Sequence, residues 1–436
     1  MPDAQSRAAG GRKTSLTAKI AIIGAGPAGL SAAKLLAEAG VPGVIVFEAR
    51  AWPGGKALSL IEGGGLHELG TCYSTLDHHA TNRWMRNIGI EQVPLGRQMF
   101  DGAPFLDYVC AGPGLPLAIE AERYLRLGAI HRLGVERRPD DPKIIEECAQ
   151  PIGEWLEHHK FVRMRRLMYR ALTTMGYGFL DEVPTVQALR WCTPGVLATG
   201  AFGALRMPID GWQSFWLRLS EQLDVRLNEP AVEVTREGPG GRLTTSTMEC
   251  RFEHLLVTIP LDDFAALTPL SAVEREIADA IEWGHYATAL VRVDNWFTHY
   301  ETDAFSRAVE SGAERGHLLA ARRPPVRLRQ PAPPGKGELY VCGQYADRGE
   351  AELDRLLRAD IEARGARLLD VVHRKIWRYF PRYRSEAIRA GLLGHMQRIQ
   401  GENRTWYSGA AFSHEAVSNI TSFNERLVRQ ILRRVR

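Results

Sequence analysis

The sequence of 436 residues lacks the features that mark several protein classes. It has no apolar run of the roughly 18 to 20 residues that span a bilayer, and residues 1–17 lack the apolar centre of a signal peptide. It also lacks a block of like charge, because 55 basic and 51 acidic residues are spread along the chain and leave a net charge of +4. These absences predict a protein that neither crosses a membrane nor binds nucleic acid.

Cysteine is scarce and scattered. The six cysteines form no Cys-x-x-Cys pair and have no histidine at metal-binding spacing. The sequence therefore predicts no metal site and no disulfide framework, and it fits a reducing cytoplasmic compartment. The cysteines are Cys72, Cys110, Cys148, Cys192, Cys250 and Cys342.

The residues that are present suit a large folded core. Hydrophobic residues make up 45% of the chain, with 10 Trp, 12 Tyr and 14 Phe. A chain of this length exceeds one ordinary core, so two interleaved domains are expected.

A strand, a glycine-rich turn and a helix form the first organised segment. An apolar strand over residues 19–23 runs into a G-x-G-x-x-G turn at 24–29, and residues 30–39 have the period of a helix. A second strand over 44–47 ends in Glu48, 24 positions after the first glycine, where an acidic side chain reaches ribose hydroxyls. The pattern predicts a mononucleotide-binding half of a Rossmann fold.

Each glycine of the turn has a separate physical role. Gly24 permits the tight turn, Gly26 lets a pyrophosphate approach bare backbone, and Gly29 lets the helix pack closely on the strand. Pro27 and Ala28 belong to the turn, and the helix that follows presents its N-terminus to the negative charge. A purely structural glycine turn is the alternative.

The continuation distinguishes FAD from NAD. Residues 48–56 read Glu-Ala-Arg-Ala-Trp-Pro-Gly-Gly-Lys, which resembles the E-x-x-x-x-x-G-G-(R/K) extension of the flavin amine oxidase and phytoene desaturase superfamily. The resemblance implies FAD as the cofactor, with its diphosphate followed by this second loop. The cofactor contacts that this resemblance adds are Glu48, Ala49, Arg50, Gly55 and Lys56.

Further cofactor contacts follow from the same resemblance. Residues 67–71 look like the loop near the isoalloxazine, and residues 252–260 look like the returning Rossmann strand. A strand over 404–410 precedes a helix, capped by Ser418 or Asn419, whose N-terminus would stabilise negative charge on a reduced flavin. The residues implied are Leu69, Gly70, Thr71, Val232 near adenine, Thr258, Pro260, Gly409, Ala410, Ser418, Asn419 and Ile420.

One of these positions departs from the superfamily pattern. The superfamily usually has an acidic residue directly after the glycine at 409, whereas this chain has Ala410. The departure weakens the assignment of this loop and raises the question of altered cofactor affinity.

The resemblance also implies the domain organisation. The fold class is α/β, a Rossmann-type FAD-binding domain of the GR2-like amine oxidase kind with an interleaved α+β cap. Short strands at 225–227, 231–234 and 243–248 are expected to form an antiparallel meander. The expected segments are a disordered arm at 1–17, the FAD-binding domain at 18–80, 205–261 and 377–436, and the substrate cap at 81–204 and 262–376.

A closer resemblance spans residues 18–434. The chain is similar to the FAD-dependent double-bond isomerases of polyunsaturated fatty acids, the linoleate isomerase group. Beyond the nucleotide motifs, the matching stretches are Gly176-Tyr177-Gly178, Val183-Pro184, Asp210-Gly211-Trp212, Tyr379-Phe380-Pro381 and Trp406-Tyr407-Ser408-Gly409.

This resemblance implies a lipophilic substrate with a carboxylate. In such a reaction the flavin takes a hydride from a doubly allylic methylene and returns it to another carbon, so the protein supplies position, an apolar channel and aromatic surfaces rather than a catalytic base. Arg97 is the predicted carboxylate clamp by correspondence with the isomerases. The predicted channel residues, each of which could equally be ordinary core, are Tyr177, Phe179, Trp191, Phe202 and Trp212.

Two other functions stay open at this point. One is an FAD-dependent oxidase or desaturase of an amine or a secondary metabolite, although amine oxidases commonly place a lysine near the flavin and residues 287–293 offer none. The other is a flavin-binding protein without turnover. The exact substrate and the oligomeric state are left open.

Overall fold

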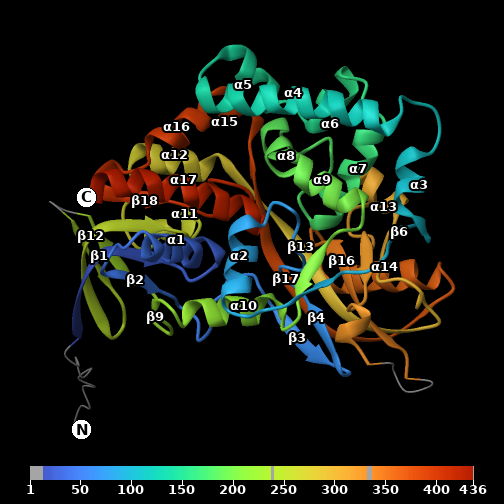
Figure 1. Ribbon diagram of the computed structural model, residues 1–436, viewed down its shortest axis with the longest axis horizontal. Helices are drawn as coiled ribbons and strands as arrows, with labels where there is room; N and C mark the ends of the chain where they lie inside the picture. Colours follow the sequence, from blue (N-terminus) through green and yellow to red (C-terminus); the bar gives the residue numbers. More distant parts are fainter. Residues whose placement is uncertain (1–12, 237–239, 331–335, 436) are drawn as a thin grey trace, which may run out of the picture.

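The protein is described here from a computed structural model that covers residues 13–236, 240–330 and 336–435. Two sheets form two lobes, and a layer of helices spans one side of both (Figure 1). The predicted N-terminal arm lies outside the described residues over positions 1–12.

The first sheet is the nucleotide-binding one. Its order is β10-β11-β12-β1-β2-β9, with β18 also beside β12, and β12, β1, β2 and β18 run parallel. This confirms the predicted Rossmann-type α/β fold. The strands are β1 (Thr14–Ile23), β2 (Val44–Phe47), β9 (Asp224–Arg226), β10 (Glu233–Thr235), β11 (Gly241–Thr244), β12 (Met248–Val257) and β18 (Thr405–Tyr407).

Two predictions about this sheet are wrong in part. Residues 14–17 belong to β1, because Thr14 pairs with Met248 and the pairing continues along β12, so the disordered arm does not reach residue 17. β9 does not join the predicted meander. It pairs parallel with β2, where it covers an edge whose backbone groups would otherwise lack partners in the sheet, and only β10, β11 and β12 are antiparallel neighbours.

The second sheet belongs to the other lobe. Its order is β17-β13-β16-β15-β14-β6-β7. The boundary predicted between residues 376 and 377 falls inside β17, which pairs with β13 up to Tyr383. The strands are β6 (Gln98–Phe100), β7 (Ala103–Pro104), β13 (Ile281–Asp294), β14 (Thr302–Ala304), β15 (Ala320–Arg322), β16 (Glu338–Tyr345) and β17 (Arg367–Tyr383).

A β-bulge interrupts the β13–β17 pairing. Trp283 pairs with Pro381 and Gly284 with Tyr379, so Phe380 is the extra residue, with φ at 48°. Its backbone N–H donates to Glu415 Oε2 at 3.0 Å instead of to a strand. The bulge therefore ties the second sheet to the segment before the last helix.

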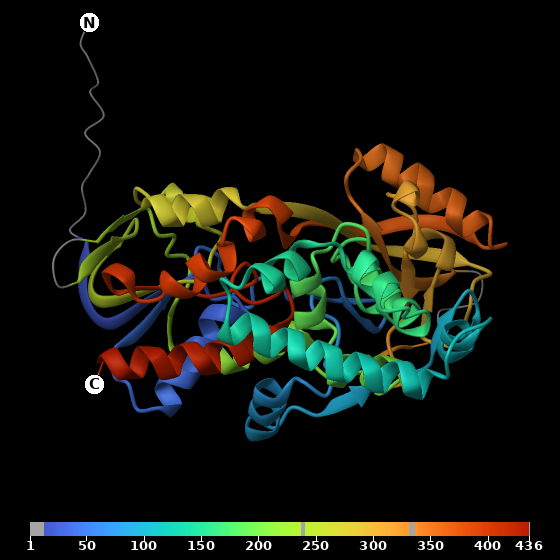
Figure 2. The same ribbon diagram turned by 90° about the horizontal axis from the view of Figure 1, so that it is seen from above.

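Helices close both lobes. α17 lies against α1 in both views of the chain (Figures 1 and 2), and Asn424 Nδ2 donates to the Ala28 carbonyl at 2.8 Å and to Ser31 Oγ at 2.7 Å. The helices of this lobe are α1 (Pro27–Glu38), α2 (His79–Asn87), α10 (Gly211–Ser220), α11 (Leu261–Ala265), α12 (Ala272–Asp279), α15 (Ser385–Arg389), α16 (Leu392–Arg398) and α17 (Val417–Val435).

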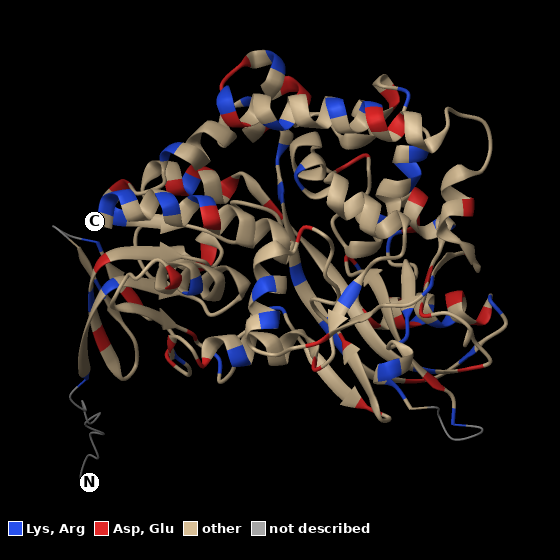
Figure 3. Cartoon of the chain, viewed as in Figure 1, with Lys and Arg blue, Asp and Glu red and all other residues tan. Residues whose placement is uncertain are grey.

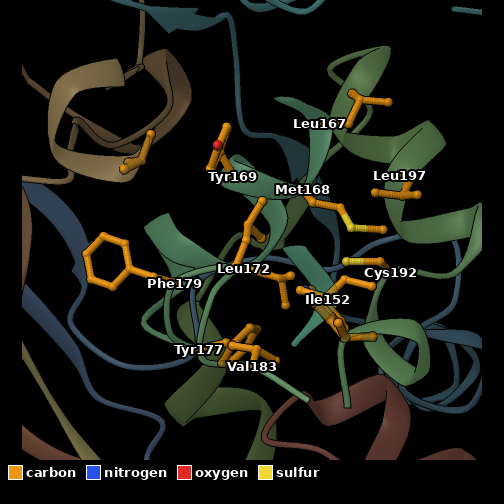
Figure 4. Packing of buried hydrophobic residues seen from close by; sticks show 14 of the residues in the cluster. Ile152, Leu167, Met168, Tyr169, Leu172, Tyr177, Phe179, Val183, Cys192 and Leu197 are labelled. Carbon is orange, nitrogen blue, oxygen red and sulfur yellow. The ribbon is translucent and has the colours of Figure 1, made fainter. Parts of the chain in front are cut away.

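The remaining helices mostly form the cap. Many of their buried side chains belong to one apolar cluster, which includes Met168, Leu172 and Tyr177 (Figure 4). These helices are α3 (Phe105–Cys110), α4 (Leu117–Arg137), α5 (Pro142–Ala149), α6 (Ile152–His158), α7 (Arg163–Ala171), α8 (Thr185–Trp191), α9 (Pro194–Ala201), α13 (Ser306–Glu310) and α14 (Glu350–Glu362). Two small antiparallel pairs complete the fold, the hairpin of β3 (Ser59–Glu62) with β4 (Gly65–Glu68) and the long-range pair of β5 (Gln92–Pro94) with β8 (Arg206–Pro208).

Charged side chains of both signs are interspersed over both lobes (Figure 3). Among the described residues, no helix combines the length and the apolar character needed to cross a membrane.

A buried carboxylate fixes the end of β18. Glu274, in the first turn of α12, forms an ion pair with Arg236, accepts from the Tyr407 hydroxyl and completes a capping box with Ser271. Burial alone would raise the pKa of Glu274, but these bonds hold it below its ordinary value.

We expect Glu274→Ala to destabilise the fold by about 3 kcal/mol, because it leaves Arg236 without its partner in a largely buried position. Because folding lowers the pKa of Glu274, its contribution is present at neutral pH and is lost as the pH falls through that lowered pKa. Denaturant unfolding at several pH values measures both effects. Glu276→Ala is the control, since that half-exposed carboxylate on the same helix contacts His395; an equal loss in the two variants would contradict the assignment.

Candidate active site

A largely apolar cavity lies where the carboxyl ends of β1, β12 and β18 meet the second sheet. We call it the first cavity, and it encloses about 290 Å³. Ligands of open α/β sheets bind at this end of the strands. Most of the predicted cofactor residues line it, namely Gly26, Pro27, Ala28, Gly55, Lys56, Leu69, Gly70, Thr71, Thr258, Pro260, Gly409, Ala410 and Ile420.

The glycines of the first turn divide into two kinds. A Cβ at Gly29 would lie 1.9 Å from the Gly24 carbonyl oxygen, and one at Gly24, where φ is 101°, would lie 2.8 Å from Thr258 Oγ1. These two glycines are required by packing. A Cβ at Gly26 would meet only the Gly55 Cα, at 3.7 Å, so nothing in the protein itself demands a glycine there. The free space at Gly26 is what close approach of a diphosphate needs.

Glu48 stands beside this turn. Its Oε2 accepts from the Ala25 N–H at 2.7 Å, and its Oε1 accepts from the Arg50 N–H at 3.0 Å. Arg50 in turn donates to the Gly55 carbonyl at 3.0 Å, while Ala49 is exposed. Each carboxylate oxygen keeps a second acceptor site, as binding of a ribose hydroxyl pair requires.

The loop at residues 69–71 has a structural reason for its glycine that the sequence analysis did not foresee. A Cβ at Gly70 would lie 1.7 Å from the Lys56 carbonyl oxygen, and the Thr71 N–H donates to that oxygen at 3.3 Å. Gly70 therefore allows close packing on the second glycine loop. Its predicted approach to the isoalloxazine stays a prediction.

The start of α17 differs from its prediction. The helix begins at Val417, so Ser418 and Asn419 lie inside its first turn and neither caps it. Ser418 Oγ is buried, and Asn419 Nδ2 donates to the Arg190 carbonyl at 2.8 Å. Ile420 faces the cavity. The N-terminus itself still meets the cavity wall, because Ala416 and Val417 also line it.

These features together fit FAD. The first turn of α1 has neither a capping side chain nor an acidic residue, and its N-terminus opens on the space beside Gly26. Gly26, Glu48 and the start of α17 would hold the diphosphate, the ribose and the flavin ring respectively. Val232 is half-exposed and lies outside the first cavity, so its contact with adenine stays a prediction.

An ion pair stands in the cavity wall. Lys56 Nζ lies 2.7 Å from Glu415 Oε1, and the ammonium group lies 5.5 Å from the ring centroid of Trp283 and 5.2 Å from that of Tyr379. The acidic residue that reaches the cavity is thus Glu415, five positions after Ala410. The positive charge of Lys56 is compensated within the protein.

Aromatic rings form much of the opposite wall. Tyr177 stacks on Tyr379 with ring centroids 5.7 Å apart and meets Trp191 edge to face at 5.7 Å. Behind them, His414 contacts Tyr177 at 4.7 Å and Trp191 at 5.6 Å. Burial lowers the pKa of His414 to about 3, so its ring is neutral.

Only two of the predicted substrate residues line the first cavity, Tyr177 and Trp191. Phe179 packs under Arg315 and against Tyr345, and Trp212 is fully buried in the core of the nucleotide-binding lobe. Phe202 is 78% exposed at the end of α9. The exposed Arg97 side chain donates to the His299 carbonyl and does not line this cavity. The structure thus places these four away from the first cavity.

Several residues of the cavity wall were not predicted from the sequence. Trp377 and Tyr379 on β17, and Tyr286 and Thr288 on β13, line the cavity in pairs two positions apart. Strand residues two apart share a face, so the alternation was a usable signal once these segments were placed in one sheet. Arg322 has no comparable local signal, because only the pairing of β15 with β16 brings it to the cavity.

The two kinds of glycine should respond differently to substitution. Gly26→Ala is expected to change the stability of the FAD-free protein by less than about 0.5 kcal/mol and to weaken FAD binding by about tenfold or more, because the methyl group takes the space of the diphosphate. Gly29→Ala should lower stability by more than about 2 kcal/mol through its clash with Gly24. Flavin fluorescence titration and denaturant unfolding separate the two effects. Unchanged FAD affinity in Gly26→Ala would refute this placement of the diphosphate.

Comparison with known proteins gives matches along nearly the whole chain. A polyenoic fatty acid isomerase of Ptilota filicina is 21% identical, over 94% of each chain. The structure of a CLA-producing fatty acid isomerase from P. acnes matches with a TM-score of 0.81 at 22% identity, covering 95% of this chain and 98% of the other. A redesigned putrescine oxidase matches with a TM-score of 0.69 at 17% identity, covering 96% and 100%. The resemblance to the isomerases within this superfamily is confirmed.

The family model that matches is described as flavin containing amine oxidoreductase, and it covers residues 27–405. This range begins at Pro27, after β1 and the first two glycines of the turn, and it continues through the second sheet and the cavity wall to the start of β18. It confirms the predicted flavin cofactor, FAD. The chain belongs to the family of flavin-containing amine oxidoreductases.

Proposed function

We propose that the protein is an FAD-dependent isomerase that shifts a double bond in a polyunsaturated fatty acid or a similar lipophilic polyene. The observation that carries the proposal is the wall of Tyr177, Trp191 and Tyr379, which faces the same cavity as the glycine loops. The names of the two isomerases among the similar proteins support it. The carboxylate of the substrate and a location in the cytoplasm are part of the proposal.

The chain contributes surroundings rather than a reacting group. Bound FAD supplies a hydride acceptor that can return the hydride to the same molecule. Loss of a hydride from a doubly allylic methylene leaves a pentadienyl cation, which ring faces attract. Tyr177 and Tyr379 present stacked rings at this wall, and the apolar surroundings limit access of water to the cation.

Three titrating groups in or behind the cavity wall, His78, Tyr177 and His414, fit a reaction without a general base. Burial lowers the pKa of His78, which lines the cavity, to about 3, and it lowers the pKa of His414 equally. Burial also raises the pKa of Tyr177 far above neutrality. None of these three groups has a pKa suited to proton transfer near pH 7.

The purified holoenzyme should convert linoleic acid, without oxygen, to a conjugated diene of unchanged mass. Absorbance of the diene, mass spectrometry of the product and an oxygen electrode follow the reaction. Deuterium placed at the doubly allylic methylene should be retained, because the apolar surroundings keep water away from the transferred hydrogen. The protein without FAD is the control.

Other outcomes identify other functions. Oxygen consumption with peroxide release in the presence of an amine, or a product lighter by two hydrogens, would replace the isomerase with an oxidase or a desaturase. Absence of any reaction across a panel of polyenes and amines would point to a flavin-binding protein without turnover.

Replacing the ring of Tyr177 tests the role of the aromatic wall. Tyr177→Leu should lower kcat by about tenfold, because the cation loses a ring face worth about 0.5–2 kcal/mol. Tyr177→Phe keeps the ring and should stay within about threefold of the wild type. Steady-state kinetics measures both, with thermal melting to verify the fold. An unchanged kcat in Tyr177→Leu would remove this ring from the mechanism.

A further inference from the structure

A second cavity adjoins the first one. It shares with the first cavity the lining residues Tyr73, Met175, Thr302 and Arg322, so the two spaces meet at a common wall. Most of its other lining side chains are apolar, among them Leu167 of α7 and Leu197 of α9, both labelled in Figure 4. The second cavity is therefore an apolar space directly beside the first one.

Arg170, near the end of α7, contributes a charge to this apolar space. The residue is 7% exposed, its guanidinium lies 5.3 Å from the ring centroid of Phe105, and it lines the second cavity. Burial lowers its pKa to about 10, which leaves it protonated at neutral pH. The side chain therefore keeps its charge although its apolar surroundings disfavour it.

No anion of the protein compensates this charge at close range. Within residues 13–236, 240–330 and 336–435, no group accepts a hydrogen bond from the Arg170 side chain, and no carboxylate lies within 4.0 Å of it. Its Nη1 is fully buried without a partner. The carboxylate of Asp303 acts on it electrostatically but takes hydrogen bonds from the Gly102 N–H and the Tyr300 hydroxyl. Buried charges in proteins are normally paired, so this guanidinium can receive an anion.

The other cations of the two cavities are already engaged. Lys56 forms its ion pair with Glu415, and Arg322 donates to the Glu68 carbonyl. Arg97, the clamp predicted from the sequence, donates to His299 and lines neither cavity. Arg170 is thus the cation best placed to receive a ligand.

We infer that Arg170 binds the carboxylate of the lipid substrate in the second cavity, while the alkyl chain extends past the shared wall into the first cavity. This inference rests on the proposed function for the identity of the substrate. The guanidinium supplies several N–H donors in one plane, which suits a carboxylate. The position of the reacting double bond is then set by its distance from the carboxyl group.

The test uses binding of a saturated acid, which needs no turnover. Calorimetric titration of the FAD-loaded protein at about pH 8 with sodium decanoate and with 1-decanol compares a charged and an uncharged head on one chain. Arg170→Met should weaken decanoate binding by about tenfold or more, as expected for a lost hydrogen-bonded charge, and should change decanol binding by less than about twofold. Arg126→Met, an exposed position on α4, is the matched control and should bind both ligands as the wild type does.

Bound flavin and melting temperature verify that each variant is folded. If Arg170→Met fails to fold, Arg170→Gln, which keeps a polar side chain, takes its place with the same expectation. Unchanged decanoate binding, an equal loss of decanoate and decanol, or a selective loss in Arg97→Met instead would overturn the inference. So would a wild-type protein that does not bind decanoate. A failure of the proposed isomerase function would be seen in a separate measurement, as the absence of product from linoleic acid.

Discussion

The carboxylate of Glu415 joins the parts of the molecule that must meet at the site. One oxygen pairs with Lys56 of the second glycine loop, and the other accepts the backbone N–H of Phe380 from β17. Glu415 itself belongs to the segment between β18 and α17. Three stretches far apart in the sequence are therefore held together by one side chain that is only 6% exposed. A carboxylate in such a position is stable because both of its oxygens are bonded.

The bulge at Phe380 depends on this bond. A φ of 48° is unfavourable for a side chain as large as phenylalanine, and the bulge takes its N–H out of the β-ladder. Glu415 satisfies that N–H. In return, the bulge brings Tyr379 to the cavity and Phe380 to within 5.2 Å of the His414 ring. The aromatic wall is thus a product of backbone geometry as much as of composition.

How much was predictable depends on the range of the interactions involved. The Rossmann strands, the glycine turn and Glu48 were predictable because their signals lie within about thirty residues and each glycine answers a local steric demand. Several of the predicted substrate residues were not. Arg97 contacts His299, and Trp212 lies in the core of the nucleotide-binding lobe, because of contacts made across more than a hundred positions of sequence. The pairing of β9 with β2 was missed for the same reason.

The low basicity of the groups around the cavity bears on the choice between isomerase and desaturase. A pentadienyl cation has two fates, loss of a proton to give a further double bond or recovery of the hydride. A buried imidazole with a pKa near 3 is a poor proton acceptor, and His414 stands behind the rings of Tyr177 and Trp191 rather than in the cavity lining. The cation would meet ring faces and apolar groups there, while Glu415 is occupied by Lys56 and Phe380. Such surroundings disfavour proton loss, which leaves recovery of the hydride as the easier outcome.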